Sequence, residues 1–125
     1  MDSNKYQAWA ITKDRKQEQY DELGSRLNSS TAQLRLLHAA MGISGESGEL
    51  MDAVKKHIMY NKPLDVENVK EELGDLLWYM SLALDQIGSS FEEVMKNNHD
   101  KLEKRYPTGF SEQLAQQRLD KVEAK

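Results

Sequence analysis

The chain has 125 residues, enough for one domain with a hydrophobic core. Its net charge of −4 and pI of about 5.4 argue against a general nucleic-acid-binding surface. The absence of cysteine excludes disulfides, a zinc–thiolate centre and a thiol nucleophile.

Leu, Ala, Glu, Lys and Gln dominate the composition and only two prolines occur, which favours helix nearly throughout. Charged residues make up 30% of the chain, as expected for slender helices that bury one stripe each. Such helices expose much of their surface, and we therefore expect self-association. The N-terminus has no apolar signal-peptide core, and the longest apolar run, between Asp75 and Asp85, is too short to span a bilayer. We therefore expect a cytoplasmic protein with neither membrane nor nucleic acid as a partner.

The first thirty residues predict one or two helices. Ser3 or Asn4 is a suitable N-cap for a helix that carries Tyr6 and Ile11. Residues 14–28 have helical spacing too, and either continue this helix or are separated from it near residues 12–14. The segment 28–31 then interrupts the pattern and offers a new N-cap.

Residues 31 to about 60 predict one long helix, ended by Lys62-Pro63. Its expected core stripe, at steps of three and four, is Leu36, Ala40, Ile43, Ser47, Leu50, Val54 and Ile58. Three glycines, Gly42, Gly45 and Gly48, each cost about 1 kcal/mol in a helix interior relative to Ala. Their presence predicts close approach of another backbone or a ligand.

Asp65 is the expected cap of a second long helix, and Gly88 its expected stop. The stripe of this helix consists of Val66, Val69, Leu73, Leu76, Met80, Leu84 and Ile87. A further helix begins after Ser90 and runs to about residue 105, and Ser111 caps a C-terminal helical tail. The sequence thus predicts a compact all-α fold, a helical bundle built on two long antiparallel helices, as a single domain over residues 1–125.

Two short carboxylate pairs carry the chemistry. Glu46 and Glu49 lie in the first long helix, and Glu72 and Asp75 lie in the second. The i, i+3 spacing places each pair on one helical face, and antiparallel packing would bring all four together. Such convergence is electrostatically unfavourable without a cation.

A site of four acids without His or Cys suits a hard cation such as Mg²⁺, with Mn²⁺ as a substitute. A di-iron bundle would need Glu-x-x-His on two helices, and neither pair has His at that position. The alternative is that the acids are solvated faces of a Glu-rich chain; the flanking glycines and the adjoining core stripes favour the metal site.

Basic and amide side chains recur near residue 100. Asn98, Lys101 and Arg105 share one helical face, with Lys104 and Tyr106 close by. This face suits the oxygens of a polyphosphate. The alternative is dipole complementarity, because cations are favoured in a last helical turn.

Three further residues are candidates for substrate binding. Lys56 lies seven residues after Glu49 and can reach its face, although a plain helix-end cation is the simpler interpretation. His38 precedes Glu46 by two turns and could contact a base or phosphate, against a structural role near an apolar face. Tyr79, four residues after Asp75, is the best stacking candidate, although aromatic residues at helical spacing commonly belong to the core.

The ordered set GISGESGEL, KEELGDLLWYM and NxxKLxKRYP resembles the MazG-like branch of the all-α nucleoside triphosphate pyrophosphohydrolases, over about residues 5–112. Small single-domain versions from bacteriophages are most similar, which would place the protein in the host cytoplasm. The resemblance implies a homodimer or dimer of dimers that uses Mg²⁺, with two or more ions per site. It also implies hydrolysis of a (deoxy)nucleoside triphosphate to the monophosphate and pyrophosphate.

Carried over residue by residue, the resemblance makes Glu46, Glu49, Glu72 and Asp75 the metal ligands and the catalytic acids. It places the triphosphate contacts at Asn98, Lys101, Lys104, Arg105 and Tyr106, and puts Tyr79 on the substrate side.

The base is not fixed by these residues: a guanine deoxynucleotide is slightly favoured by the likeness to phage versions, against dUTP or dCTP. The same residues are compatible with a phosphoribosyl-ATP pyrophosphohydrolase, and with a non-catalytic helical dimer that binds a partner.

Overall fold

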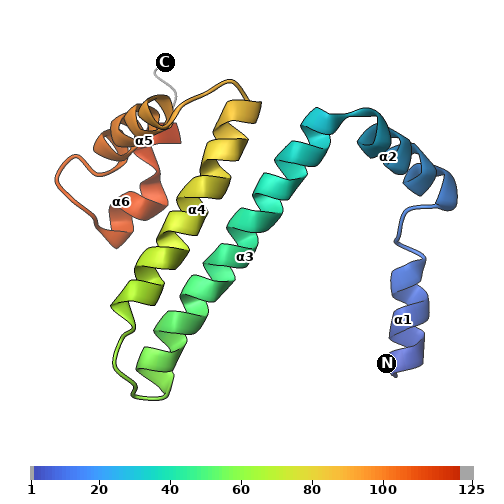
Figure 1. Ribbon diagram of the computed structural model, residues 1–125, viewed down its shortest axis with the longest axis horizontal. Coiled ribbons are helices and arrows are strands. Elements are labelled where there is room, and N and C mark those ends of the chain that lie inside the picture. Colours follow the sequence, from blue (N-terminus) through green and yellow to red (C-terminus); the bar gives the residue numbers. More distant parts are fainter. Residues whose placement is uncertain (1, 122–125) are drawn as a thin grey trace.

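The computed structural model describes residues 2–121, which form helices and no β-strand, so the prediction of an all-α fold is confirmed (Figure 1). The helices of this region are α1 (Ser3–Ile11), α2 (Gln17–Ser29), α3 (Thr31–Met59), α4 (Val66–Gln86), α5 (Phe91–Arg105), α6 (Glu112–Gln117) and the 3-10 turn η1 (Leu119–Lys121).

Two long antiparallel helices, α3 and α4, form the centre of the molecule (Figure 1). The predicted caps are confirmed: the Ser30 hydroxyl accepts the backbone N–H of Gln33, and the Asp65 carboxylate accepts that of Asn68. Asn61 adopts a φ of 52° in the connection, a conformation that Asn tolerates better than most residues. Local sequence therefore sets both ends of the turn between the two helices.

The surface that α3 buries against α4 differs from its predicted apolar stripe. Ala39 and Ala53 are its buried residues, whereas Leu36 and Ile58 are largely exposed. The ring of Tyr79 on α4 occupies the space where a Cβ on Gly42 would lie. Small side chains let the two helices approach closely, so this face is buried more deeply than the bulkier stripe. The stripe prediction is therefore wrong in part: Ile43, Leu50 and Val54 are half-buried, and the other four residues are exposed.

On α4 the outcome is similar. Leu76, a predicted stripe residue, is buried together with Glu72. Val66, Leu73 and Ile87, from the same predicted stripe, are exposed. The apolar sides of both long helices thus remain largely uncovered.

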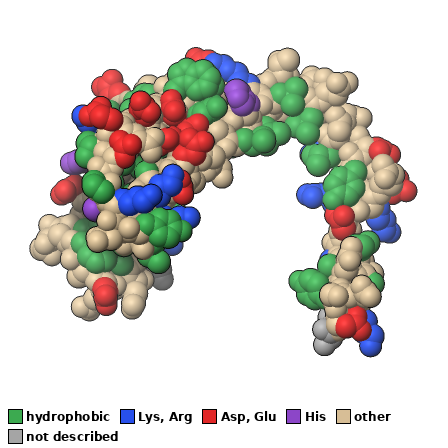
Figure 2. All heavy atoms as spheres, turned by 60° about the horizontal axis from the view of Figure 1, so that its bottom comes forward, with side chains coloured by type: hydrophobic (Ala, Val, Ile, Leu, Met, Phe, Trp, Pro, Cys, Tyr) green, Lys and Arg blue, Asp and Glu red, His purple; other side chains and the backbone are tan. Residues whose placement is uncertain are grey.

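The N-terminal arm, α1 and α2, leaves the hairpin at Thr31 and turns back alongside α3 (Figure 1). The space-filling view shows a gap between the arm and the rest of the molecule (Figure 2). The two helices are separate, so the interrupted arrangement is the correct one of the two that the sequence allows. Asp2 caps α1 by accepting the backbone N–H of Lys5, so the prediction of Ser3 or Asn4 as the cap is wrong. Ser3 and Asn4 are instead the first two residues of the helix, because the carboxylate of Asp2 already provides the cap.

The C-terminal part consists of α5, α6 and η1 beside α4 (Figure 1). Gly88 ends α4 with a φ of 69°, as predicted. Ser111 caps α6 as predicted, but Arg118, with a φ of 49°, ends this helix after six residues, so the predicted helical tail is interrupted before η1. Residues 122–125 of that predicted tail lie outside the described residues.

The surface of the chain is large for its size. Its accessible area is 10411 Å², whereas a compact monomer of the same mass exposes about 6,800 Å². The expectation of a compact domain is therefore wrong for the single chain, because its apolar side chains outnumber the positions that it buries. Between residues 2 and 121, no helix combines the length and apolar character that a bilayer crossing demands.

Candidate active site

The four predicted acids meet where α3 and α4 face each other. Glu46, Glu72 and Asp75 each offer a carboxylate oxygen within 4.8 Å of the other two. Glu49 lies outside this trio but next to Glu72. Figure 2 shows acidic side chains gathered on one face of the α3–α4 hairpin. The antiparallel packing therefore brings together two pairs that lie more than twenty residues apart.

The acids at the centre of this cluster lack compensation. One carboxylate oxygen of Glu46 and one of Glu72 are buried without a hydrogen-bond partner. The pKa of Glu72 is raised to about 7, first by the adjacent carboxyl group of Glu46, then by burial of its own carboxyl and by the adjacent Glu49. Among the described residues, none of the four acids forms an ion pair. Buried carboxylate oxygens without partners are costly unless a proton or cation satisfies them.

The donor set fits a divalent cation that prefers oxygen. All the converging atoms are carboxylate oxygens, and no His or Cys belongs to the cluster. Mg²⁺ and Mn²⁺ prefer such ligands, and a cation would satisfy the two unpaired oxygens of Glu46 and Glu72. The residues present thus match the metal that the sequence predicts.

A polar cavity of about 510 Å³ adjoins the acids. Its lining comprises Gly45, Gly48, Glu49, Asp52, Lys56, Asn68 and Glu72. A Cβ on Gly45 or Gly48 would meet no atom within 4 Å, so neither glycine serves packing within the chain. The expected close approach is therefore made by a side chain at Gly42, while the other two glycines leave open space beside the acids.

Lys56, predicted from its spacing to Glu49, lines this cavity. Its ammonium group lies 2.8 Å from the Asp52 carboxylate, which raises the pKa of Lys56 and lowers that of Asp52. Asn68 lies on α4 and also lines the cavity. Asp52 and Asn68 were not predicted from the sequence, although the i, i+4 spacings from Asp52 to Lys56 and from Asn68 to Glu72 are a possible signal.

Tyr79 lies across α3 rather than in open solvent. Its ring packs edge-on against His38 at 5.6 Å and against Trp78 at 4.9 Å between centroids. The ring also covers Gly42. Tyr79 and His38 therefore hold each other near the acidic cluster, and the structural interpretation of both has a physical basis.

The predicted basic face of α5 is divided. Arg105 donates two hydrogen bonds to Asp120, at 2.6 and 2.9 Å, and lies 5.9 Å from the centroid of the Tyr106 ring. Lys101 and Lys104 are exposed. In this chain the guanidinium thus tethers η1 to α5.

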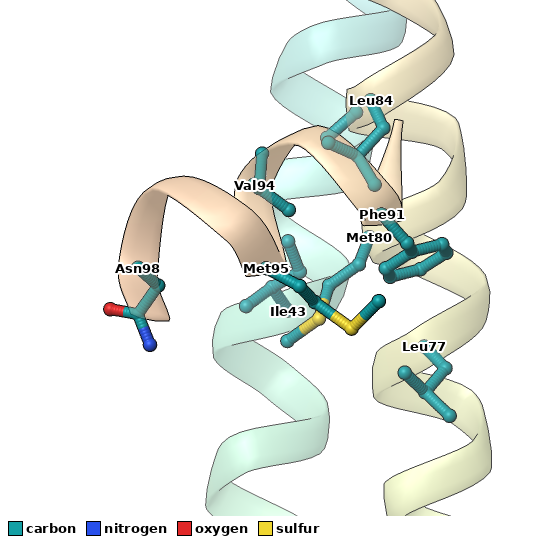
Figure 3. A pocket seen from close by; sticks show the side chains of 9 residues that line it. Ile43, Leu77, Met80, Leu84, Phe91, Val94, Met95 and Asn98 are labelled. Atoms are coloured by element: carbon teal, nitrogen blue, oxygen red, sulfur yellow. The ribbon is translucent and has the colours of Figure 1, made fainter. Parts of the chain in front are cut away.

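Asn98 lines a different feature, an apolar groove between α3, α4 and α5 (Figure 3). The residues of the predicted basic face thus have different surroundings in the single chain: Arg105 binds Asp120, Asn98 lines the apolar groove, and the two lysines are exposed.

Two antiparallel helices bring four carboxylates together beside a polar cavity. The protein is thus of the all-α class, with an acidic site suited to a divalent cation. Residues 33–110 match the family model of the MazG nucleotide pyrophosphohydrolase domain. The Gene 37 protein of Mycobacterium phage L5 is 34% identical over 79 residues, which cover 59% of this chain and 68% of that protein. No solved structure matches the chain significantly.

The chain belongs to the MazG nucleotide pyrophosphohydrolase family, because the match covers more than half of its length and includes both acid pairs. The predicted resemblance is thereby confirmed, and a phage protein is among its relatives. Nucleotide pyrophosphohydrolysis is the activity that the family description assigns.

Proposed function

We propose that this protein hydrolyses a nucleoside triphosphate between its α- and β-phosphates, in a Mg²⁺-dependent reaction that yields the monophosphate and pyrophosphate. The observation that carries this proposal is the convergence of Glu46, Glu72 and Asp75 with two buried, unpaired carboxylate oxygens. An acidic cluster of this kind repels a triphosphate unless cations bind first.

In the proposed site, Glu46, Glu72 and Asp75 hold the metal, and Glu49 completes the ligand set or accepts a proton. When bound, Mg²⁺ supplies charge neutralisation at the phosphates and acidifies coordinated water. Glu49 is suited to the role of general base because it lies at the edge of the trio and lines the open cavity.

The chemical step is an in-line displacement at the α-phosphorus. The oxygen of a water molecule attacks, its proton passes to Glu49, and the bond to the α–β bridging oxygen breaks. Pyrophosphate leaves with the electron pair of that bond. Lys56 and Asn68 line the cavity beside the acids, where they can donate hydrogen bonds to phosphate oxygens.

The remaining predicted contacts belong to the same proposal. Lys101, Lys104, Arg105 and Tyr106 on α5, with Asn98, would neutralise the outer phosphates. For Arg105 this requires release from Asp120, or a substrate that binds the N–H groups that Asp120 leaves free. Tyr79 and His38 would flank the nucleoside.

We further propose that the working protein is a homodimer or a dimer of dimers. The chain exposes about 3,600 Å² more surface than a compact monomer of its mass. Apolar side chains of α3 and α4, including Leu37, Met41 and Leu77, contribute to that surface. Apolar patches of this extent commonly mark interfaces.

The reaction is tested by incubating the protein with each common NTP and dNTP, with and without Mg²⁺, and resolving pyrophosphate from orthophosphate. Mg²⁺-dependent monophosphate and pyrophosphate are expected, with Glu46→Gln as the inactive control. Orthophosphate as the product would contradict attack at the α-phosphorus. Absence of turnover, or Glu46→Gln and Asp75→Asn variants that keep their function, would favour a non-catalytic binding protein.

For the substrate we propose a deoxynucleotide with a guanine base, on the likeness to phage relatives, one of which matches here. The same panel ranks dGTP and GTP against dUTP and dCTP. Equal turnover of ribo- and deoxynucleotides would contradict the proposed preference. If no triphosphate is hydrolysed, phosphoribosyl-ATP is the next substrate to assay.

A further inference from the structure

An apolar groove lies on the hairpin where α5 crosses it. It has a volume of about 510 Å³ and is lined by Ile43, Leu77, Met80, Ala83, Leu84, Phe91, Val94, Met95 and Asn98. Figure 3 shows these side chains converging from α3, α4 and α5, with Asn98 at one end. Leu77 is 54% exposed and Met95 is 61% exposed, so the groove is open to solvent. An exposed apolar groove of this size on a small protein commonly marks a binding site for another apolar surface.

The N-terminal helix α1 carries apolar side chains that have no surface to pack on within the chain. It buries none of its residues, and Tyr6, Trp9 and Ile11 are all largely exposed. Tyr6 and Trp9 pack together, with ring centroids 5.5 Å apart, and form an aromatic ridge on one side of the helix. A helix of nine residues is marginal in water without tertiary contacts, so α1 needs a surface to pack on.

The chain's own groove is not that surface. In Figure 1 the arm and α5 lie on opposite sides of the α3–α4 hairpin, and Figure 2 shows the same separation from another direction. The arm is tethered through α2 to the beginning of α3 at Thr31. A second copy of the chain can present its groove to α1 without breaking this tether.

Charge favours the same pairing. Residues 2–16 carry four cations, Lys5, Lys13, Arg15 and Lys16, against two acids. Helix α4, which forms one wall of the groove, carries three acids outside the proposed metal site, Glu67, Glu71 and Asp85, against one lysine. A basic arm on an acidic hairpin gains both orientation and association rate from this complementarity.

Area supports a second copy rather than a small ligand. Obligate homodimers commonly bury about 2,000–5,000 Å² in total over both partners. Each chain of such a dimer therefore buries about 1,000–2,500 Å². The excess exposed area of about 3,600 Å² on each chain is larger than this, so a dimer that pairs only the hairpins would leave apolar surface exposed. An exchanged arm adds contact area without any new element.

We propose that α1 of one copy packs its Tyr6–Trp9 ridge into the α3–α4–α5 groove of a second copy, so that the two chains exchange N-terminal arms. This inference rests on the proposed self-association and specifies its geometry. It makes no use of the catalytic proposal, so a failure of either one leaves the other standing.

The chain contains no cysteine, which permits a clean cross-linking test. Ala8→Cys, next to Trp9, and Val94→Cys, in the groove, are placed in separate full-length chains that carry different tags and are co-expressed. After purification through both tags, a bismaleimide should link the two chains at least tenfold more efficiently than in the matched pair of Ala8→Cys with Glu103→Cys. Glu103 is an exposed residue of the same helix α5 that does not line the groove.

Sedimentation of the unlabelled protein completes the test. Trp9→Ala should raise the dissociation constant of the assembly by at least tenfold. Sedimentation of the Ala8→Cys and Glu103→Cys chains shows whether the cysteine substitutions themselves leave the assembly intact. A dimer without the Ala8–Val94 link would overturn the proposal, and so would a monomer. A link formed within one chain of the double variant Ala8→Cys/Val94→Cys would also contradict it. Protection of Val94→Cys by a nucleotide, with no link to the arm, would instead assign the groove to the substrate.

Discussion

The two sides of the α3–α4 hairpin differ in how their side chains are satisfied. On one side, Glu46 and Glu72 bury carboxylate oxygens without partners, beside a polar cavity. Near α5, Leu77, Met80 and Met95 leave an apolar groove open. Each side is incomplete in the single chain, but the deficiencies are of different kinds: the acids need a cation, whereas the groove needs apolar contact. The same pair of helices thus presents an acidic surface and an apolar surface, each of which suits a different kind of ligand.

The largest effect is expected on the acidic side. Glu72→Gln should lower turnover by about 10²- to 10³-fold, as the loss of one preorganised electrostatic group commonly does. In the presence of a chelator the same variant should melt at a higher temperature than the wild type, because it removes one charge from crowded acids. Activity assays and thermal melts with and without Mg²⁺ measure both effects.

Glu71→Gln is the matched control, since Glu71 is the exposed neighbour of Glu72 on α4. It should leave both turnover and the metal-free melting temperature nearly unchanged. If the two variants behave alike, the acids are solvated helix faces and the proposed site is wrong.

The next effect concerns the packing that holds the acid pairs together. Gly42→Ala should destabilise the protein by about 1–3 kcal/mol, because its Cβ would lie 2.2 Å from the Tyr79 ring. Gly45→Ala has open space and should stabilise the helix by up to about 1 kcal/mol. Urea unfolding of the two variants under identical buffer conditions measures the difference, and equal effects would contradict the close approach of Tyr79 to α3.

A smaller effect is expected at the wall of the polar cavity. Lys56→Met should raise KM for the triphosphate by about tenfold, because the ammonium group would lose its hydrogen bond to a phosphate oxygen. Lys55→Met is the control, since Lys55 also neighbours Asp52, at 3.7 Å, but does not line the cavity. Steady-state kinetics of both variants distinguish a specific contact from a general change of charge.

The smallest effect is the pH dependence of the C-terminal tether. The Arg105 guanidinium lowers the pKa of Asp120 to about 2 from the ordinary 3.8. Because the folded-state pKa is depressed, this ion pair contributes its full stability above about pH 4, and the contribution is lost as pH falls toward 2. Asp120→Asn should therefore lower the melting temperature at pH 5 and have a diminishing effect between pH 4 and pH 2. A constant difference over this range would contradict the assignment.

Much of the fold could be predicted because its signals are local. Ser30 and Asp65 cap α3 and α4, and Gly88 ends α4 with positive φ; in each case neighbouring residues suffice to produce the feature. The cap of α1 was misassigned by one residue, since Asp2, Ser3 and Asn4 are chemically equivalent candidates in sequence. The end of α6 at Arg118 could not be predicted, because no glycine or proline lies there.

The candidate site could be predicted in part for the same reason. The i, i+3 spacing of each acid pair is a property of the sequence, and it placed Glu46 and Glu72 correctly on facing helices. That Arg105 binds Asp120 depends on how η1 folds back over α5, which no spacing rule contains. The cavity contacts of Asn68 likewise depend on how closely the two long helices approach.

The sequence by itself determined the two long helices and their N-caps, the acid pairs and the membership of the MazG family, because these depend on residues close in the chain or on ordered motifs. Only the tertiary structure decided which face of each long helix is buried. Apolar periodicity selected Leu36 and Ile58, whereas the structure buried Ala39 and Ala53. The physical reason is that helices pack along the faces that permit the closest approach, and a periodicity measures hydrophobicity without measuring the size of the opposing side chains.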